Sequence, residues 1–158
     1  MSEPAIATFA AGCFWGVESV FSQLPGVLDA TSGYTGGTVA DPSYRQVCTG
    51  TTGHAEAVEV RYDPSAISFD RLLDTFWKIH DPTTPNRQGP DVGTQYRSAI
   101  FVHSQEEREA ARASLERAQA NVKKPIVTQI ETAGPFYAAE EYHQKYLEKN
   151  GAACHISV

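Results

Sequence analysis

Residues 5–34 read AIATFAAGCFWGVESVFSQLPGVLDATSGY and predict a strand, a helix and a second strand in succession. The strands cover Ala5 to Ala10 and Val27 to Tyr34, and the helix between them covers Cys13 to Ser22. Apolar residues recur in this stretch at the spacing of one helical face, namely Phe14, Val17, Phe21 and Leu24. The Leu-Pro-Gly run at 24–26 then ends the helix.

The same alternation of strand and helix continues along the chain. His54 to Tyr62 alternates apolar and polar residues in the manner of a strand. Ser68 is a candidate N-cap for a helix over Phe69 to His80, and Gln95 to His103 predicts another strand. The first six elements therefore follow the order β-α-β-β-α-β, which is typical of the ferredoxin-like, split βαβ arrangement.

More elements and a tail are expected after this core. A capping-box pattern at Ser104 opens a helix that ends near Asn121. The remaining segments are a strand, a helix and a mobile tail, over Ile126–Glu131, Ala138–Lys149 and residues 150–158. The whole chain, residues 1–158, is expected to form one two-layer α+β domain in which helices cover a mixed sheet.

Composition limits the classes of function. The chain has 158 residues, of which 41% are apolar, so it can bury a hydrophobic core. Lys and Arg number 13 against 19 Asp and Glu, and the net charge of −6 argues against sequence-independent nucleic-acid binding. We see neither a secretory signal nor an apolar run of about 18 residues, so no membrane span is expected. Three cysteines suit a reducing compartment, and we expect a cytoplasmic monomer.

Cys13 is the first candidate catalytic residue, because it lies where a predicted strand ends and a helix begins. Unpaired N–H groups at a helix N-terminus favour a thiolate, which is the nucleophilic form of cysteine. Gly12 and Gly16 allow close approach of backbone or ligand. A buried, inert cysteine that only fills space would fit the same junction.

The two aromatic residues after Cys13 have different expected positions. Phe14 lies on the apolar face of the helix, whereas Trp15 lies about 100° further round and can line a pocket beside the thiol. An aromatic pocket next to a thiol suits a small apolar group such as a methyl. Both rings could equally be ordinary core residues.

Glu56 has the same parity as Val58 and Val60 in its strand, so it is expected to point into the core. Burial disfavours a charged carboxylate and raises its pKa, which would let Glu56 act as a general acid near neutral pH. Alternatively, the side chain reaches water at the rim of the sheet or pairs with Arg97.

The loop from Asp81 to Thr94 is long for a compact domain, and long ordered loops often carry function. It contains Asp91, and Tyr96 follows it directly. Tyr34 and Tyr44 come from an earlier Gly-rich loop. A tyrosine donates a hydrogen bond to an oxygen without carrying charge, although each of these is also compatible with simple packing.

The sequence indicates no cofactor and no metal. The glycines after Tyr34 match neither a dinucleotide fingerprint nor a phosphate loop. The cysteines form no C-x-x-C pair, and His54 and His155 do not complete a zinc pattern. Chemistry would then come from the thiol itself. Cys154 in the tail is a candidate disulfide partner, and Cys48 is either a second candidate or a buried spacer.

Taken together, these residues resemble the A-class peptide methionine sulfoxide reductases. The matching motifs keep the order and spacing of that family from about Phe9 to Cys154. They are Gly12-Cys13-Phe14-Trp15-Gly16, Gly33-Tyr34-Thr35-Gly36-Gly37, Tyr44-Arg45, Gly53-His54-Ala55-Glu56, His80-Asp81-Pro82, Asp91 and Gly93-Thr94-Gln95-Tyr96-Arg97-Ser98. The first and the last of these motifs are specific in combination.

The resemblance implies reduction of the S epimer of methionine sulfoxide, free or in oxidised proteins, to methionine. Cys13 would attack the sulfoxide sulfur while Glu56 protonates the departing oxygen. The implied contacts to that oxygen come from Tyr44, Tyr96 and, through water, Asp91, and the implied substrate-binding residues are Phe14, Trp15, Tyr34 and His54. Cys13 would be left as a sulfenic acid, a resolving cysteine would convert it to a disulfide, and thioredoxin would restore the dithiol.

The chain departs from the family pattern near its C-terminus. Ala152-Ala153-Cys154-His155 replaces the usual Gly-Tyr-Cys-like approach. We expect Cys154 to be the resolving cysteine, with Cys48 as the fallback.

Two other functions fit parts of the pattern. One is an acyl-transfer enzyme that uses Cys13 with His54 and Glu56, since the last two share one face of a strand. The other is a ferredoxin-like binding module in which the cysteine is incidental.

Overall fold

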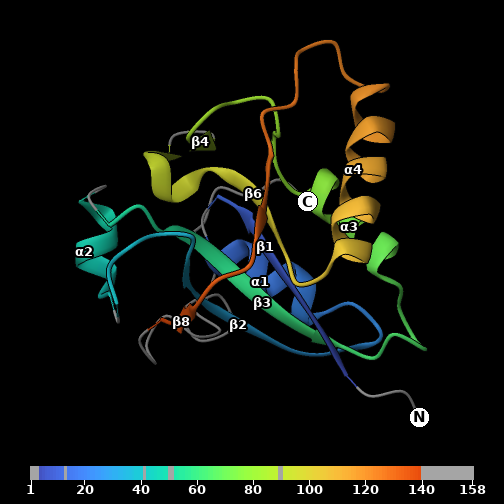
Figure 1. Ribbon diagram of the computed structural model, residues 1–158, viewed down its shortest axis with the longest axis horizontal. Helices are drawn as coiled ribbons and strands as arrows, with labels where there is room; N and C mark the ends of the chain where they lie inside the picture. Colours follow the sequence, from blue (N-terminus) through green and yellow to red (C-terminus); the bar gives the residue numbers. More distant parts are fainter. Residues whose placement is uncertain (1–3, 13, 41, 50–51, 89–90, 140–158) are drawn as a thin grey trace.

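The structure, a computed structural model, describes residues 4–12, 14–40, 42–49, 52–88 and 91–139. The side chains of Trp15, Cys48, Arg87, Asp91 and Val92 lie outside this description. The elements (Figure 1) are β1 (Ala5–Ala11), α1 (Phe14–Ser22), β2 (Val27–Thr35), α2 (Tyr44–Cys48), β3 (Ala55–Tyr62), α3 (Phe69–Lys78), β4 (Arg87–Gln88), β5 (Asp91–Val92), the 3₁₀ turn η1 (Thr94–Tyr96), β6 (Ser98–Val102), α4 (Gln105–Gln119), β7 (Gln129–Thr132) and β8 (Phe136–Ala138).

Six of the strands form one sheet in the order β7-β6-β1-β3-β2-β8. Neighbouring strands are antiparallel except β6 and β7, which run parallel. The sheet is therefore mixed, and helices pack against it, so the predicted α+β class is confirmed. The short strands β4 and β5 form a separate antiparallel pair.

The main core lies between one face of the sheet and the helices α1 and α3. Phe9 of β1 stacks on Phe21 of α1 with ring centroids 5.0 Å apart, and its ring lies 5.4 Å from that of Phe76 in α3. In Figure 1, α1 lies behind the central strands. Phe14, Val17 and Phe21 are all buried, so the predicted apolar face of this helix is confirmed.

The opposite face of the sheet carries smaller residues. Its cluster consists of Ala10, Ala55, Ala57, Ala99 and Phe101, with Ala133 and Phe136 packed against it. In Figure 1 the segment between β7 and β8 crosses in front of the sheet, in keeping with the packing of Ala133 and Phe136 against these small residues.

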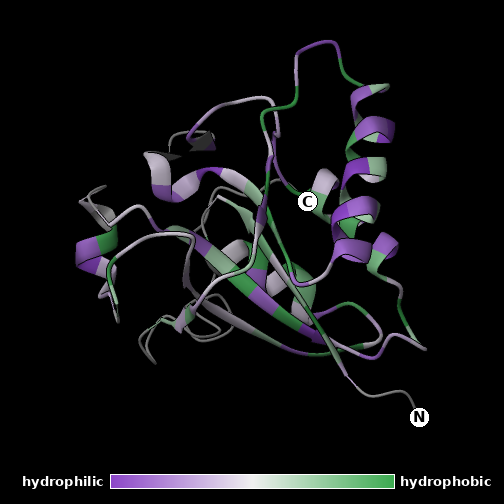
Figure 2. Cartoon of the chain, in the orientation of Figure 1, coloured by the Kyte–Doolittle hydropathy of each residue, from purple (hydrophilic) through white to green (hydrophobic). Residues whose placement is uncertain are grey.

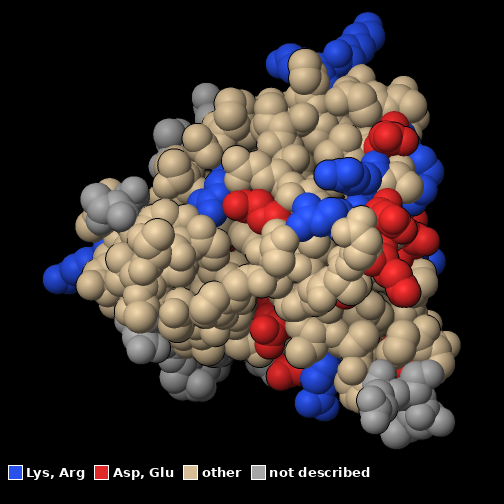
Figure 3. Space-filling view, in the orientation of Figure 1, with Lys and Arg blue, Asp and Glu red and all other residues tan. Residues whose placement is uncertain are grey.

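The outer side of α4 is polar and charged. Figure 2 shows hydrophilic residues on the outward side of this helix and apolar residues toward α3 and the sheet. Figure 3 shows acidic and basic side chains gathered over the same helix. Alternating charges along a helix face are typical of a solvated surface.

Serine caps begin three of the helices. The Ser68 and Ser104 hydroxyls accept the N–H groups of Arg71 and Glu107, so both serines are N-caps as predicted. The capping box expected at Ser104 is incomplete, because the Glu107 carboxylate accepts the N–H of His103 instead of that of Ser104. α2 was not predicted, although its sequence carries the signal. Ser43 accepts from Gln46 N–H while the Gln46 side chain accepts from Ser43 N–H, which is a capping box.

Two predicted boundaries are wrong near the long loop. Gln95 and Tyr96 lie in η1 instead of a strand, because the Tyr96 N–H donates to the Gly93 carbonyl and closes a turn. β6 therefore begins at Ser98. α3 ends at Lys78, so His80 lies beyond the helix.

The predicted helix from Ala138 is wrong at its first residue. Ala138 ends β8, where it pairs with Gly33 of β2. The rest of that predicted helix, from residue 140, and the predicted tail lie outside the described residues. Within the part of the chain that is described, no helix is long and apolar enough to cross a membrane.

Candidate active site

The candidate nucleophile Cys13 lies outside the described residues, but both of its neighbours are described. Gly12 follows β1 with φ +94°, a backbone conformation that residues other than glycine rarely adopt. Phe14 is the first residue of α1. β1 therefore ends just before Cys13 and α1 begins just after it, which is the strand–helix junction that the sequence predicts.

Glu56 reaches this junction from β3. Its side chain is 1% exposed, and its Oε1 accepts the backbone N–H of Phe14 at 3.2 Å. The carboxyl group is therefore buried and lies beside the residue that follows Cys13. The Arg97 guanidinium, which the sequence offered as a partner for Glu56, donates to the carbonyl oxygens of Gly53 and Thr94 at 3.0 Å each.

Three aromatic rings adjoin the same junction. The ring of Phe14 lies 5.6 Å from that of Tyr34 and 6.2 Å from that of Tyr44, between centroids. Tyr34 is fully buried and lies opposite Glu56 in the β2–β3 register, whereas Tyr44 is half-buried at the start of α2. Phe14, Tyr34, Tyr44 and Glu56 therefore form one cluster from four elements.

Both ring nitrogens of His54 form hydrogen bonds with the backbone of the Gly-rich loop. Its Nδ1 accepts the N–H of Gly37 at 3.0 Å, and its Nε2 lies 2.7 Å from the carbonyl oxygen of Val39. These partners assign a neutral ring with the proton on Nε2. With the ring buried and both nitrogens engaged, His54 ties residues 37–39 to the start of β3.

His80 lies in a second buried chain of hydrogen bonds. Its Nδ1 donates to the Phe76 carbonyl at 2.7 Å, so its Nε2 accepts from the Ser98 hydroxyl, also at 2.7 Å. Ser98 in turn lies 2.7 Å from the hydroxyl of Thr128. Desolvation by burial lowers the pKa of His80 to about 4, which keeps the ring neutral in this chain.

Tyr96 follows the long loop in η1, and side-chain hydrogen bonds hold this region at two points. Arg97, just after η1, joins the loop to the residue before His54 through Thr94 and Gly53. Burial lowers the pKa of Arg97, and the nearby charge of Glu131 acts in the opposite direction. Gln88, at the other end, closes the segment from Asp81 with its side-chain amide.

Sequence reasoning missed two buried polar residues in this region. Glu18 is 1% exposed and accepts from the Ser32 hydroxyl at 2.8 Å. Glu18 lies four residues after Phe14, which puts it on the apolar face of the helix. Applying the helical period to polar residues, as the strand period was applied to Glu56, would have found it. Gln88 is 7% exposed and has no comparable signal, because its partners come from loop geometry.

Several predicted site residues cannot be placed. Cys154 lies outside the described residues, and so do the side chains of Trp15, Cys48 and Asp91. The backbone of Asp91 is described and pairs with Gln88 across the β4–β5 hairpin. Among the residues whose side chains are described, no three His, Cys, Asp or Glu gather in a way that could hold a metal ion.

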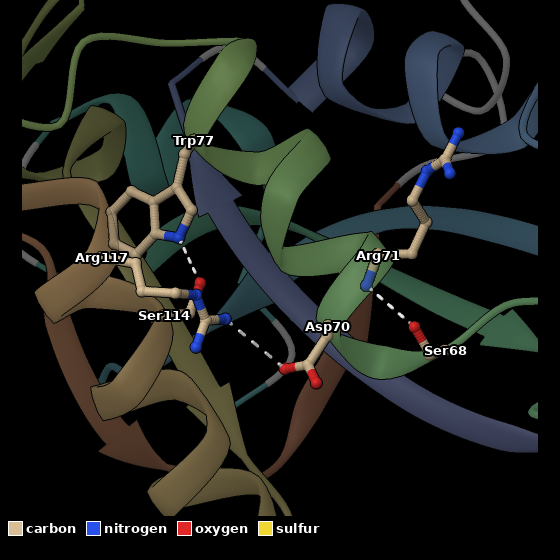
Figure 4. Close-up of polar contacts among 6 residues, drawn as sticks. All are labelled: Ser68, Asp70, Arg71, Trp77, Ser114 and Arg117. Atoms are coloured by element: carbon tan, nitrogen blue, oxygen red, sulfur yellow. Dashed lines mark hydrogen bonds and ion pairs between the residues drawn. The ribbon is translucent and has the colours of Figure 1, made fainter. Parts of the chain in front are cut away.

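A groove of about 390 Å³ lies elsewhere, between α3 and α4. Two of its lining residues are hydrogen-bonded (Figure 4), because the Trp77 indole N–H donates to the Ser114 hydroxyl at 2.7 Å. Arg117 and Asp70 form an exposed ion pair at 3.9 Å on the same helices. None of the sequence-predicted site residues lines this groove.

Comparison with known proteins gives a consistent result. A family model described as peptide methionine sulfoxide reductase matches residues 5–158. The peptide methionine sulfoxide reductase MsrA of Methanoculleus marisnigri is 61% identical, over 92% of this chain and 90% of that protein. The reduced form of Mxr1 from Saccharomyces cerevisiae superposes with a TM-score of 0.92 at 40% identity, covering 97% of this chain and 89% of Mxr1.

A second yeast structure is Mxr1 in complex with Trx2. It matches with a TM-score of 0.67 at 28% identity, over 96% of this chain and 86% of that one. The family model spans almost the whole chain, and the buried Glu56 beside the Cys13 junction lies within it. The chain belongs to the peptide methionine sulfoxide reductase family.

Proposed function

We propose that this chain reduces methionine S-sulfoxide, free and in oxidised proteins, to methionine, and that it acts as a single catalytic domain. The observation that carries the proposal is the buried carboxyl group of Glu56, which accepts the N–H of the residue next to Cys13. A nucleophile and an acid at one helix N-terminus are what this reaction needs, because a sulfoxide oxygen leaves poorly unless it is protonated.

The proposed step transfers the oxygen of the sulfoxide to the sulfur of Cys13. The Cys13 thiolate attacks the sulfoxide sulfur, and Glu56 delivers a proton to the oxygen. The oxygen ends on Cys13 as a sulfenic acid, while the substrate sulfur leaves as the thioether of methionine. The substrate sulfur is reduced by two electrons and the Cys13 sulfur is oxidised by two. Burial favours the neutral, protonated form of a carboxyl group, which suits the role of Glu56 as donor.

Tyr44, Tyr96 and Asp91 are proposed as the groups that stabilise the departing oxygen, Asp91 through water. Support for Tyr44 comes from its ring contact with Phe14, one residue from Cys13. The methyl group of the substrate is assigned to Phe14, Trp15 and Tyr34, and the Phe14–Tyr34 ring contact supports this assignment. An apolar methyl site would also fix the handedness of attack.

His54 is assigned a different role from the substrate contact that the sequence suggested. Both ring nitrogens bond to the loop at residues 37–39, so His54 acts on the site by holding that loop. The same bonds argue against an acyl-transfer enzyme, in which His54 would have to take a proton from Cys13.

The second half of the cycle needs a resolving thiol and a reductant. We assign the first to Cys154, with Cys48 as the fallback, so that the sulfenic acid condenses to a disulfide with loss of water. Thioredoxin is the proposed reductant, and the solved complex of the related Mxr1 with Trx2 supports it. A cytoplasmic location and a monomeric state complete this proposal, since the cysteine content suits a reducing compartment.

The four central strands are proposed to form a ferredoxin-like unit. The order β6-β1-β3-β2, with every neighbouring pair antiparallel, supports it. In such a unit both β-α-β crossovers put their helices on one face, in keeping with the shared core of α1 and α3.

One experiment tests the proposed function. The reduced protein is mixed with one equivalent of free methionine-S-sulfoxide, and methionine, free thiols and disulfides are then measured by mass spectrometry. We expect one methionine per chain and a disulfide that includes Cys13, whereas Cys13→Ser gives neither. Methionine formation by Cys13→Ser, or acylation of Cys13 by ester substrates in place of reduction, would contradict the proposal.

A further inference from the structure

Gln88 is a buried amide side chain that the proposed reaction leaves without a role. It is 7% exposed, in the two-residue strand β4. Its Oε1 accepts the backbone N–H of Asp81 at 2.9 Å, and its Nε2 donates to the Asp81 carbonyl at 2.6 Å. Nε2 also lies 3.4 Å from the Thr84 hydroxyl. One side chain therefore satisfies both backbone groups of a residue seven positions earlier.

The aliphatic part of Gln88 lies against the residue that precedes Cys13. A Cβ added to Gly12 would lie 2.8 Å from Gln88 Cγ and 2.9 Å from Gln88 Cβ. Gly12 also has a positive φ, so the backbone turns at this point directly beneath the Gln88 side chain. The amide end thus fixes the loop, and the methylene end touches the strand–helix junction of the nucleophile.

Backbone pairing also links Gln88 to the segment that carries the proposed oxygen-binding residues. It pairs with Asp91 across the β4–β5 hairpin. The Gly93 N–H donates to the Asn86 carbonyl, and the Tyr96 N–H donates to the Gly93 carbonyl, so η1 is joined to the same hairpin. A change in the position of Gln88 would therefore move the segment of Asp91 and Tyr96 relative to Cys13.

We propose that Gln88 is a positioning residue, which sets the separation between the Cys13 junction and the loop that carries Asp91 and Tyr96. This inference rests on the proposed function, since it assumes that these residues act on the sulfoxide oxygen. Donors around a departing oxygen must be held close to their productive positions, and a misplacement of about 1 Å can cost about 100-fold in rate.

The chain offers a matched control in Gln119. Its Oε1 accepts the N–H of Ile126 at 2.8 Å, and its Nε2 donates to the Lys124 carbonyl at 2.9 Å. Gln119 therefore closes a loop with the same amide chemistry, but at the end of α4. Gln88→Leu and Gln119→Leu each remove one such closure, and Leu at position 88 keeps the Cβ and Cγ that lie over Gly12.

The test compares kcat, KM and the rate of Cys13 alkylation, at a temperature where unfolding curves show each variant to be folded. For Gln88→Leu we expect kcat for methionine-S-sulfoxide to fall about 10- to 100-fold with KM within about 3-fold, because the methyl site is untouched. The rate of Cys13 alkylation by iodoacetamide, mapped by mass spectrometry, should stay within about 3-fold, since alkylation uses no oxygen donors. Gln119→Leu should match wild type in all three.

Other outcomes separate this inference from the proposed function. Equal kcat values for Gln88→Leu and Gln119→Leu would overturn the positioning role. The proposed function would still stand in that case, provided that Cys13→Ser is inactive. Activity in Cys13→Ser would overturn the proposed function itself, whatever Gln88 does. If Gln88→Leu does not fold, Gln88→Asn serves instead, because it keeps an amide but shortens it by one methylene; wild-type kcat in that variant would also overturn the role.

Discussion

At the scale of single residues, the proposed chemistry depends on a carboxyl group that the fold keeps out of water. Glu56 is 1% exposed and lies on β3, and its half-buried neighbour Glu59 points to the other face of that strand. A general acid contributes about 100- to 10,000-fold to a rate. We therefore expect Glu56→Gln to lower kcat for methionine-S-sulfoxide at least about 100-fold, because an amide delivers no proton.

Glu59→Gln is the control for that variant, since it makes the same change three positions further along the strand, on the opposite face. Steady-state kinetics and an unfolding curve for both proteins separate loss of the acid from loss of the fold. An active Glu56→Gln enzyme would remove the carboxyl group from the mechanism.

A second residue-scale prediction concerns the pH dependence of stability. The pKa of His80 falls from 6.5 to about 4 on folding, so the unfolded chain binds a proton at His80 below pH 6.5 while the folded chain does not. Stability is therefore lost as the pH falls from 6.5 toward 4, and His80 makes no such contribution above pH 6.5. Between pH 7 and pH 5 the loss is at most about 2 kcal/mol.

Urea unfolding of wild type and His80→Asn at pH 7 and pH 5 checks this expectation. The variant is less stable at pH 7 because it loses the buried hydrogen bonds, but its stability should change less between the two pH values. Asp81 does not interfere, since its hydrogen bonds to Thr83 lower its pKa from 3.8, below this range. An identical pH dependence in both proteins would contradict the role of His80.

The sequence predicts the burial of a candidate site residue well where a local period decides the direction of its side chain. Glu56 follows from strand parity, and Phe14 follows from helical spacing. His54 has the parity of Glu56, yet its ring bonds to a loop 15 to 17 residues earlier, which no local period describes. Arg97 likewise reaches Gly53, 44 residues earlier, and Gln88 bonds to Asp81 within an irregular loop, so neither set of partners follows a local period.

At the scale of elements, the errors cluster where pairing with another segment overrides local preference. Residues 136–138 form β8 because β2 offers them an edge, although the stretch after Ala138 has a helical pattern. Gly33 permits this pairing, since a Cβ there would lie 2.4 Å from the Tyr137 carbonyl oxygen and 2.5 Å from the Phe136 ring. Neither contact can be read from residues near Gly33 in the chain.

That close contact predicts the cost of adding one methyl group. Gly33→Ala should destabilise the protein by about 1–3 kcal/mol, because β8 must shift away from β2 to make room. A Cβ added at Gly134, two residues before Phe136, meets nothing within 4 Å, so Gly134→Ala should leave stability within about 0.5 kcal/mol. The measurement is the free energy of unfolding of both variants in urea. Equal values would contradict the prediction, because they would show that β8 shifts away from β2 without loss of stability.

At the scale of the whole molecule, one sheet brings together chain segments that carry different parts of the site. β1 leads into Cys13, β3 carries Glu56, and β2 leads through the Gly-rich loop to Tyr44. The order of strands along the chain predicts the α+β class, but it does not show that β8 joins the far edge beside β2. That adjacency depends on the packing of residues 133–138 over the small side chains of the second face.

The proposed catalytic cycle also belongs to this scale, because it uses two thiols of this chain and a dithiol partner. α2 begins at Tyr44, whose ring contacts Phe14, and ends at Cys48, so Cys48 belongs to an element that contacts the residue after Cys13. We nevertheless expect Cys154 to resolve the sulfenic acid. Cys154→Ser should form one methionine per chain from methionine-S-sulfoxide and then stop, since thioredoxin finds no disulfide to reduce.

Cys48→Ser is the matched variant and should cycle with thioredoxin at the rate of wild type. The measurement is methionine formed per chain, with thioredoxin, its reductase and NADPH supplied in excess, followed by mapping of the trapped disulfide. Continued cycling in Cys154→Ser together with arrest in Cys48→Ser would transfer the resolving role to Cys48. In that case the recycling step would belong to α2, beside the Phe14 and Tyr44 rings, because the thiol that resolves Cys13 has to reach the sulfur on which the oxygen was left.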